Sequence, residues 1–185
     1  RSSRWCVVAK YLIETIALDS PASSITFSNI PQEYTDLQLV ISARSDNSDY
    51  GSNNTTIDNS LIFNGSTTNV TRLFVSGQGS QVATEVGTYP NQFWMPDTGS
   101  TTNTFNNTSV YICNYTSSSN KSFSVGSASE NNSVDADKFL VAGLWQQTAA
   151  ITSLGMQPLS GNYAVNTKAS LYGIVAGNDG TTTVS

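Results

Sequence analysis

The sequence contains no histidine, and charged residues make up only 11% of its 185 residues, whereas a typical soluble domain carries about 25%. Without histidine, nucleophilic catalysis by a Ser–His or Cys–His pair is excluded, because no imidazole can act as the base. The two cysteines, Cys6 and Cys113, stand far apart and cannot supply a usual zinc ligand set. We therefore expect no catalytic residue, no metal and no cofactor.

Clustered basic residues and long apolar runs are also missing. The net charge is -5 and the eight Lys and Arg residues are scattered, so no surface for nucleic-acid phosphates is expected. No run reaches the roughly 18 apolar residues of a membrane span. Two cysteines do not make a disulfide framework. We expect two free thiols from a reducing compartment, although a single bridge stays possible.

The polar surface is built instead from Ser, Thr and Asn, which make up roughly a third or more of the residues. Hydroxyl and amide groups neither titrate nor depend on charges that salt screens. Such a surface suits a protein that is exposed to varied solvent outside a cell. The 38% of hydrophobic residues can still form a core, and the length fits one domain.

Short alternating apolar segments between Gly, Pro, Asn and Ser turns predict an all-β fold, an antiparallel β-sandwich of jelly-roll type. The expected strands are 11–18, 24–30, 37–44, 61–63, 70–75, 109–115, 122–126, 139–146, 151–156 and 170–174. Both faces of 11–18 are mostly apolar, which predicts a buried strand. Segments 45–60 and 76–104 lack this alternation and are expected to be loops. The expected core comprises Ile16, Leu39, Ile41, Ile112, Leu144, Trp145, Leu154 and Leu171.

Two acidic segments are candidate sites. Asp135 and Asp137 lie beside Glu130, and a glycosidase needs two positioned carboxylates, but this spacing is more typical of a solvated turn. Residues 46–51 match the beginning of a calcium-binding loop, yet Tyr50 and Ile57 stand where oxygen ligands are required. We favour a plain polar loop.

Four aromatic residues in expected loops form a candidate surface-ligand loop: Tyr50, Tyr89, Phe93 and Trp94. Exposed aromatic side chains can stack on sugar rings or fill a partner's pocket. The alternative, which we favour, is that Phe93 and Trp94 cap the end of the core.

Several short motifs follow one another through residues 11–174. They include YLIET at 11–15, SITFSNIP at 24–31, FNG at 63–65, AGLWQQTAAITSL at 142–154 and ASLYGI at 169–174. Together and in this order, they resemble a family of tailed-bacteriophage virion structural proteins that is common in phages of aquatic bacteria. Cys113 stands where the family has Pro. The resemblance implies an all-β module on the virion, assembled in the host cytoplasm, with no catalytic residues to carry over.

Residues 1–10 lie outside the resemblance and are expected to be an anchor or linker, followed by a sandwich domain at 11–176 and a polar tail at 177–185. Trp5, Val7 and Val8 are candidate partner-docking residues, because a short apolar terminus needs a covering partner. The absence of an initiator Met suggests that the chain begins inside a longer polypeptide or after processing. The expected partners are other virion proteins, further copies of the chain in a trimer, and a host surface glycan.

The sequence thus predicts a non-enzymatic virion protein, either a tail-fibre or receptor-binding module or a capsid decoration protein. The alternative is a carbohydrate-binding module of a secreted protein, which predicts an aromatic platform on a flat face. A glycan hydrolase is disfavoured by the missing histidine and the lack of a convincing acid pair.

Overall fold

The computed structural model describes residues 9–47, 56–88, 91–129 and 136–175. Within these ranges the chain forms twelve strands and no helix. The strands are β1 (Ala9–Ala17), β2 (Ile25–Phe27), β3 (Asp36–Ser42), β4 (Thr56–Phe63), β5 (Val70–Gln78), β6 (Gln81–Gly87), β7 (Asn91–Pro96), β8 (Asn107–Ile112), β9 (Lys121–Ser129), β10 (Asp137–Trp145), β11 (Leu154–Pro158) and β12 (Lys168–Val175).

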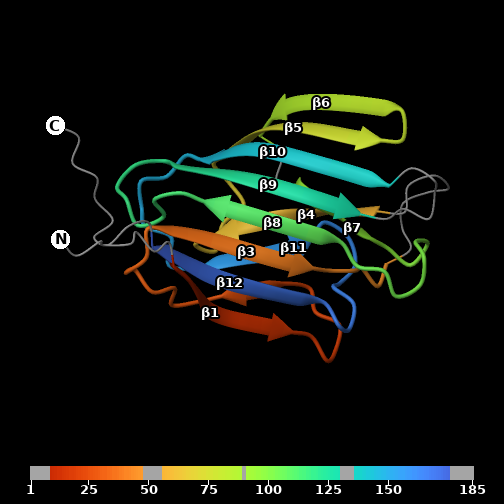
Figure 1. Cartoon of the computed structure of the whole chain (residues 1–185), viewed down its shortest axis with the longest axis horizontal. Helices are drawn as coiled ribbons and strands as arrows, with labels where there is room; N and C mark the ends of the chain where they lie inside the picture. The colour runs from red at the N-terminus through yellow and green to blue at the C-terminus, as the bar shows by residue number, and fades with distance from the viewer. Residues whose placement is uncertain (1–8, 48–55, 89–90, 130–135, 176–185) are drawn as a thin grey trace, which may run out of the picture.

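The strands form two antiparallel sheets that pack face to face (Figure 1). The large sheet has eight strands in the order β1-β12-β3-β8-β9-β10-β5-β6, and the small sheet has four in the order β2-β11-β4-β7. The large sheet therefore ends in two free edges, β1 and β6, on opposite sides of the molecule. The prediction of an all-β antiparallel sandwich is confirmed. Its finer assignment to the jelly-roll type stays a prediction.

The core lies between the two sheets and is built by strict alternation along the strands. In β3, Leu37, Leu39 and Ile41 are buried, whereas Gln38 and Val40 between them face the opposite side. Six expected core residues are buried: Leu39, Ile41, Ile112, Trp145, Leu154 and Leu171. The other two, Ile16 and Leu144, are only partly buried. Ile16 lies on the edge strand β1, and Leu144 points away from the core because its neighbour Trp145 points into it.

One close approach of backbone and ring requires a glycine. Gly143 of β10 pairs with Phe123 of β9, and the Phe123 ring lies across its backbone. A Cβ added to Gly143 would come within 2.1 Å of this ring. The missing side chain lets Phe123 pack against Phe63 of the small sheet, with ring centroids 5.4 Å apart. A glycine in the middle of a strand thus joins the two layers.

The prediction of a loop at 76–104 is wrong, because this segment contains the strands β6 and β7. The edge strand β6 is exposed on both faces, and β7 is buried for almost its whole length. Neither strand needs apolar residues to alternate with polar ones, so the period-2 signal is absent. The loop expected at 45–60 is too long for the same reason, since β4 begins at Thr56 and buries Asn59 and Ser60.

The prediction that 11–18 is buried on both faces is also wrong. This segment belongs to β1, which pairs only with β12. Tyr11 and Leu12 remain 51% and 57% exposed. The strand begins at Ala9, so its first two residues lie in the segment expected to be a linker. In β1, apolar residues on both faces therefore belong to an edge strand whose surface is hydrophobic.

Candidate interaction surface

The outer face of the large sheet, turned away from the small sheet, changes character from one edge to the other. Across its middle the side chains are mostly small or polar, as in the cross-strand neighbours Gln38, Tyr111 and Ser124. Toward the β6 edge they become apolar. The cross-strand register places seven residues there, which we call the apolar face: Leu140, Ala142 and Leu144 of β10, Leu73 and Val75 of β5, and Val82 and Val86 of β6.

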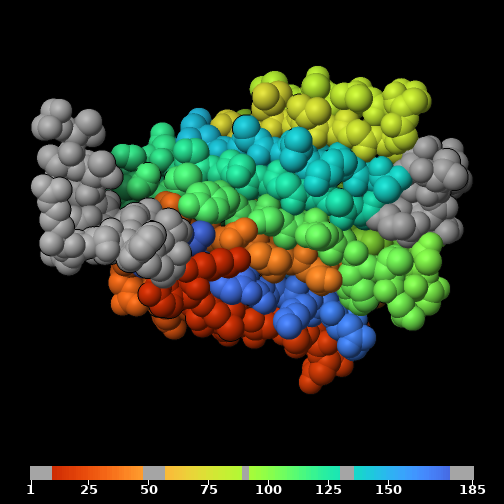
Figure 2. Space-filling view, viewed as in Figure 1, coloured from red at the N-terminus to blue at the C-terminus, as the bar shows by residue number. Residues whose placement is uncertain are grey.

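The apolar face is open to solvent in the isolated chain. Val82 is 75% exposed, Val86 is 77% exposed and Leu140 is 52% exposed. In Figure 2, which looks onto this side of the large sheet, β5 and β6 form the upper rim of the molecule. None of the seven residues is charged, and Thr84 of β6 and the exposed Lys138 of β10 lie on the same outer face. A contiguous apolar patch on a soluble protein commonly marks an interaction surface.

A shallow hollow of about 330 Å³ lies within the apolar face. Leu73, Val86 and Leu144 line it, and Ser122 provides a hydroxyl at its border. The other described residues that line it are Thr71, Arg72, Ala142 and Gly143. Its chemistry suits an apolar side chain of a partner more than a reacting substrate.

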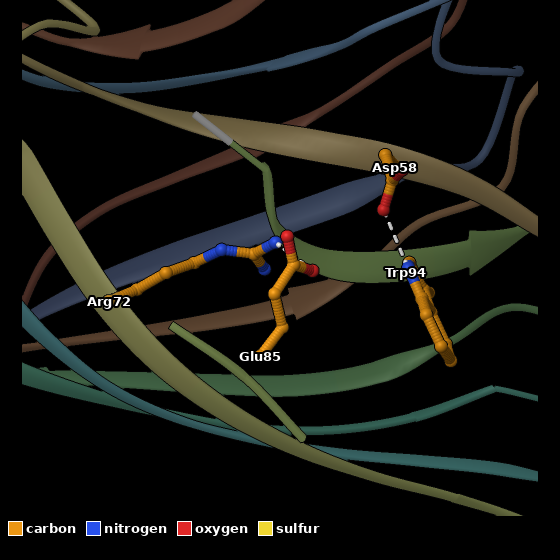
Figure 3. Close-up of polar contacts among 4 residues, drawn as sticks. All are labelled: Asp58, Arg72, Glu85 and Trp94. Carbon is orange, nitrogen blue, oxygen red and sulfur yellow. Dashed lines mark hydrogen bonds and ion pairs between the residues drawn. The ribbon is translucent and has the colours of Figure 1, made fainter. Parts of the chain in front are cut away.

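Beneath β6, on the side facing the small sheet, an ion pair ties the edge hairpin together (Figure 3). The Arg72 side chain is only 1% exposed, and its guanidinium lies 4.5 Å from the centre of the Phe74 ring. Glu85 of β6 approaches it at 3.6 Å and is 40% exposed. Both charges therefore lie on the inner side of the hairpin, which leaves the apolar face uncharged.

Phe93 and Trp94 do not belong to a surface loop. Both lie on β7, where Phe93 has no exposed surface and Trp94 is partly buried against Phe139, with ring centroids 4.7 Å apart. The indole Nε1 of Trp94 donates a hydrogen bond of 2.6 Å to Asp58 on the neighbouring strand β4 (Figure 3). The expectation that they lie in a surface loop is therefore wrong, because both are strand residues whose rings contact the sandwich interior. Their role as ligand residues stays a prediction.

The other sequence-derived candidates fall mostly outside the described residues: Tyr50, Tyr89, Asp135, Trp5, Val7 and Val8. Asp137 is described and buried at the beginning of β10. Burial raises the pKa of its carboxyl to about 6, while a hydrogen bond with Gln78 acts in the opposite direction. Cys113 is a free, exposed thiol, whereas Cys6 lies outside the described residues.

Asp46, the first residue of the calcium-like segment, already has protein partners. Its carboxylate accepts hydrogen bonds from the backbone N–H and the side-chain amide of Asn162, at 2.8 and 3.1 Å. In the described part of the chain, no three acidic or cysteine side chains come together as a metal site would require. The role visible for Asp46 is to join two loops.

An aromatic pair near the opposite edge of the large sheet is not apparent from the sequence. Tyr11 of β1 and Tyr34 stack with ring centroids 6.0 Å apart, and together with Glu33 and Val175 they line a hollow of about 360 Å³. The Tyr34 ring lies directly over Gly173, where a Cβ would come within 2.2 Å of it. Burial, followed by the nearby Glu33 carboxylate, raises the pKa of the Tyr34 hydroxyl.

The fold and its surfaces define the class of the protein as an antiparallel β-sandwich with an exposed, uncharged apolar face at one edge. Comparison with family models, curated proteins and solved structures finds no match for this chain. In the ranges that the structure describes, no helix has the length and apolarity needed to cross a membrane.

Proposed function

We propose that the chain is a non-enzymatic structural protein of a bacteriophage particle, exposed on it as a tail-fibre or receptor-binding module or as a capsid decoration protein. The ordered motifs of residues 11–174 support the phage assignment by resemblance. The observation that carries an assembly role is the apolar face, because a part that is repeated on a particle must offer a surface for its neighbours.

The test is to locate the chain on particles. Antibodies against the purified protein should label intact phage particles released by cells that express it, and its peptides should appear in mass spectra of purified particles. Labelling of heads would assign decoration, and labelling of tails would assign attachment. Peptides found only in the soluble fraction, never on particles, would overturn the proposal.

A carbohydrate-binding module of a secreted protein is the second candidate. The observation that favours it is the Tyr11–Tyr34 pair, because the exposed ring of Tyr11 and the partly buried ring of Tyr34 can stack on a sugar, and the nearby Glu33 carboxylate can accept its hydroxyl hydrogen bonds. A glycan array should then give binding that Tyr11→Ala abolishes. Leu12→Ala is the matched control, since Leu12 is equally exposed but lies on the other face of β1.

Docking through residues 1–10 and a three-fold assembly both stay predictions of the sequence, because Trp5, Val7 and Val8 lie outside the described residues. Deleting residues 1–10 and measuring incorporation into particles tests the docking role.

A further inference from the structure

The two free edges of the large sheet are protected very differently. Edge strands invite pairing with another chain, and proteins usually block them with Lys, Pro, inward-pointing charges or β-bulges. β1 has Lys10, Glu14 and a bulge between Leu12 and Glu14. β6 has no Lys, Arg or Pro, and its one inward-pointing charge, Glu85, is already paired with Arg72. Its register with β5 runs without a bulge from Arg72–Gly87 to Gln78–Gln81. Within the described part of the chain, the edge at β6 is therefore the open one.

The hairpin geometry determines which backbone groups of β6 are free. The turn between β5 and β6 has two residues, Gly79 and Ser80, and Gln78 pairs with Gln81 across it. The pair that closes a two-residue hairpin exchanges hydrogen bonds, and such pairs alternate along an antiparallel ladder. Residues 81, 83, 85 and 87 therefore bond to β5. The N–H and C=O groups of Val82, Thr84 and Val86 point toward the free edge.

The side chains of β6 are arranged symmetrically about its middle residue. Val82 and Val86 stand two residues on either side of Thr84, all on the outer face. Two antiparallel copies centred on Thr84 would overlap along the whole seven-residue strand. Thr84 would then face its own copy, and each Val82 would face Val86 of the other chain, which is a favourable β-branched cross-strand pair.

The charge of Glu85 also favours the register centred on Thr84. Glu85 is the only charged residue of β6, and Arg72 holds its carboxylate on the inner side at 3.6 Å. In the register centred on Thr84, Glu85 faces Ala83 of the second copy. A shift of two residues that brings Thr84 opposite Val86 would place Glu85 directly opposite Glu85, and like charges directly opposite destabilise a strand pair.

We propose that β6 is a self-association edge, at which two copies of this chain pair antiparallel about a two-fold axis through Thr84 and join their large sheets into one. The occupant is a second copy because the strand complements itself in backbone hydrogen bonds, side-chain shape and charge. The inference deepens the assembly role proposed above and rests on it. The pairing also makes the apolar faces of the two copies continuous.

Cysteine cross-linking tests the register directly in the full chain, with Cys6→Ser and Cys113→Ser as the background. Thr84→Cys should form a disulfide-linked dimer under mild oxidation, because hydrogen-bonded antiparallel pairs have Cα atoms about 5.5 Å apart. Val82→Cys alone and Val86→Cys alone should not, because each sulfur would lie about 14 Å along the strand from its copy. Mixing these two variants should restore the cross-link.

Solution mass gives the second measurement. The unmodified chain should be dimeric by light scattering at high concentration and dissociate on dilution. Thr84→Lys should shift it to the monomer, since two ammonium groups would face each other. Ala17→Lys, an exposed change on the opposite edge strand, should leave the dimer intact. A chain that stays monomeric at every concentration, or equal cross-linking of all three single cysteine variants, would overturn the proposal.

The two proposals fail in distinguishable ways. If Thr84→Lys is monomeric yet joins particles as well as the unmodified chain, pairing at β6 occurs but is not used in assembly, and the inference is wrong for the particle. If the dimer and its register are found but the chain never joins a particle, the β6 pairing stands and the virion assignment fails.

Discussion

Single asparagine side chains take structural positions that charged residues often fill in other proteins. Asn106 is buried, and its Oδ1 accepts a hydrogen bond of 2.7 Å from the backbone N–H of Ala43. Its amide nitrogen donates to the carbonyl oxygen of Trp94 at 2.8 Å. Since Ala43 follows β3 of the large sheet and Trp94 belongs to β7 of the small sheet, one amide connects the two layers.

Replacing Asn106 with Ala should destabilise the fold, because it leaves a buried N–H and a buried carbonyl without this partner. Each unsatisfied buried group costs about 1–3 kcal/mol. Urea unfolding should show a loss in that range or above. Asn103→Ala is a poor control because Asn103 has a positive φ, so Asn107→Ala, an exposed position on β8, serves instead. Equal stability of the two variants would show that the bridge contributes nothing.

Asn64 shows why asparagine is useful in the turns. It forms the predicted Asn64–Gly65 turn with φ of 49°, a left-handed conformation that Asn tolerates better than most residues. Its Oδ1 accepts hydrogen bonds from the N–H groups of Thr152 and Ser153, and its amide donates to the carbonyl of Ala150. One side chain therefore both shapes a turn and holds a distant loop.

Leu39 and Ile41 are buried at the centre of β3, as predicted. Changing either to Ala should lower the free energy of unfolding by roughly 2–5 kcal/mol, because the change removes apolar contacts and leaves a cavity. Val82→Ala on the exposed edge should change it by less than about 0.5 kcal/mol, as is usual at surfaces. Denaturant titration measures both, and a similar loss for all three variants would contradict the assignment of faces.

Asp137 should make stability depend on pH. The pKa of this carboxyl is raised to about 6, mainly by burial, whereas in the unfolded chain it lies near 3.9. The folded state therefore holds an extra proton between these values, and stability should fall as the pH rises through this window. At neutral pH, Asp137→Asn should be more stable than the unmodified chain by about 1–3 kcal/mol, since each pKa unit is worth about 1.4 kcal/mol.

The measurement for Asp137 is the difference between the two unfolding free energies at several pH values. The difference should shrink as the pH falls and vanish below about pH 4, where the carboxyl becomes neutral in both states. An Asn variant that is less stable at neutral pH would show that the ionised form is the one that the fold stabilises.

At the scale of an element, the β5–β6 hairpin combines a buried guanidinium with an exposed apolar side. Arg72→Met should be nearly neutral or stabilising, because an apolar side chain of similar length can fill the space beside Phe74 and Phe139. Glu85→Ala should destabilise, because it removes the carboxylate that faces the buried charge. In the double variant, the loss from Glu85→Ala should disappear.

A double-mutant cycle measures this coupling from four unfolding free energies. Additive effects of Arg72→Met and Glu85→Ala would mean that the ion pair does not hold the hairpin. Glu85→Gln is a useful further variant, because it keeps the size of the side chain and removes only its charge.

The same element shows where prediction from the sequence reaches its limit. Val82, Thr84 and Val86 alternate after the Gly79–Ser80 turn, which is a strand signal, but the segment 76–104 as a whole is rich in small polar residues. A strand that is exposed on both faces needs no apolar alternation, so its pattern resembles a loop. β7 is hidden for the opposite reason, since its residues are buried on both faces.

At the scale of the whole molecule, the fold depends little on charge. Among the described residues, one ion pair is present, between Arg72, which is buried, and Glu85, which is 40% exposed. The midpoint of thermal unfolding should therefore change little between low salt and about 1 M salt, where the Debye length falls to about 3 Å. A large loss at high salt, comparable to that caused by Leu39→Ala, would indicate that surface charges contribute more.

The sequence by itself determined the all-β class, the positions of most strands and most of the core. The alternation along a single strand is enough to predict which side chains share a face, as in β3 with Leu37, Leu39 and Ile41. The tertiary structure decided which faces are covered. Thr15 pairs with Ser170 across 155 positions, and only such distant pairings make β1 an edge, bury Phe93 and leave β6 open. Alternation is a local property, whereas burial and edge position depend on which distant strand lies alongside.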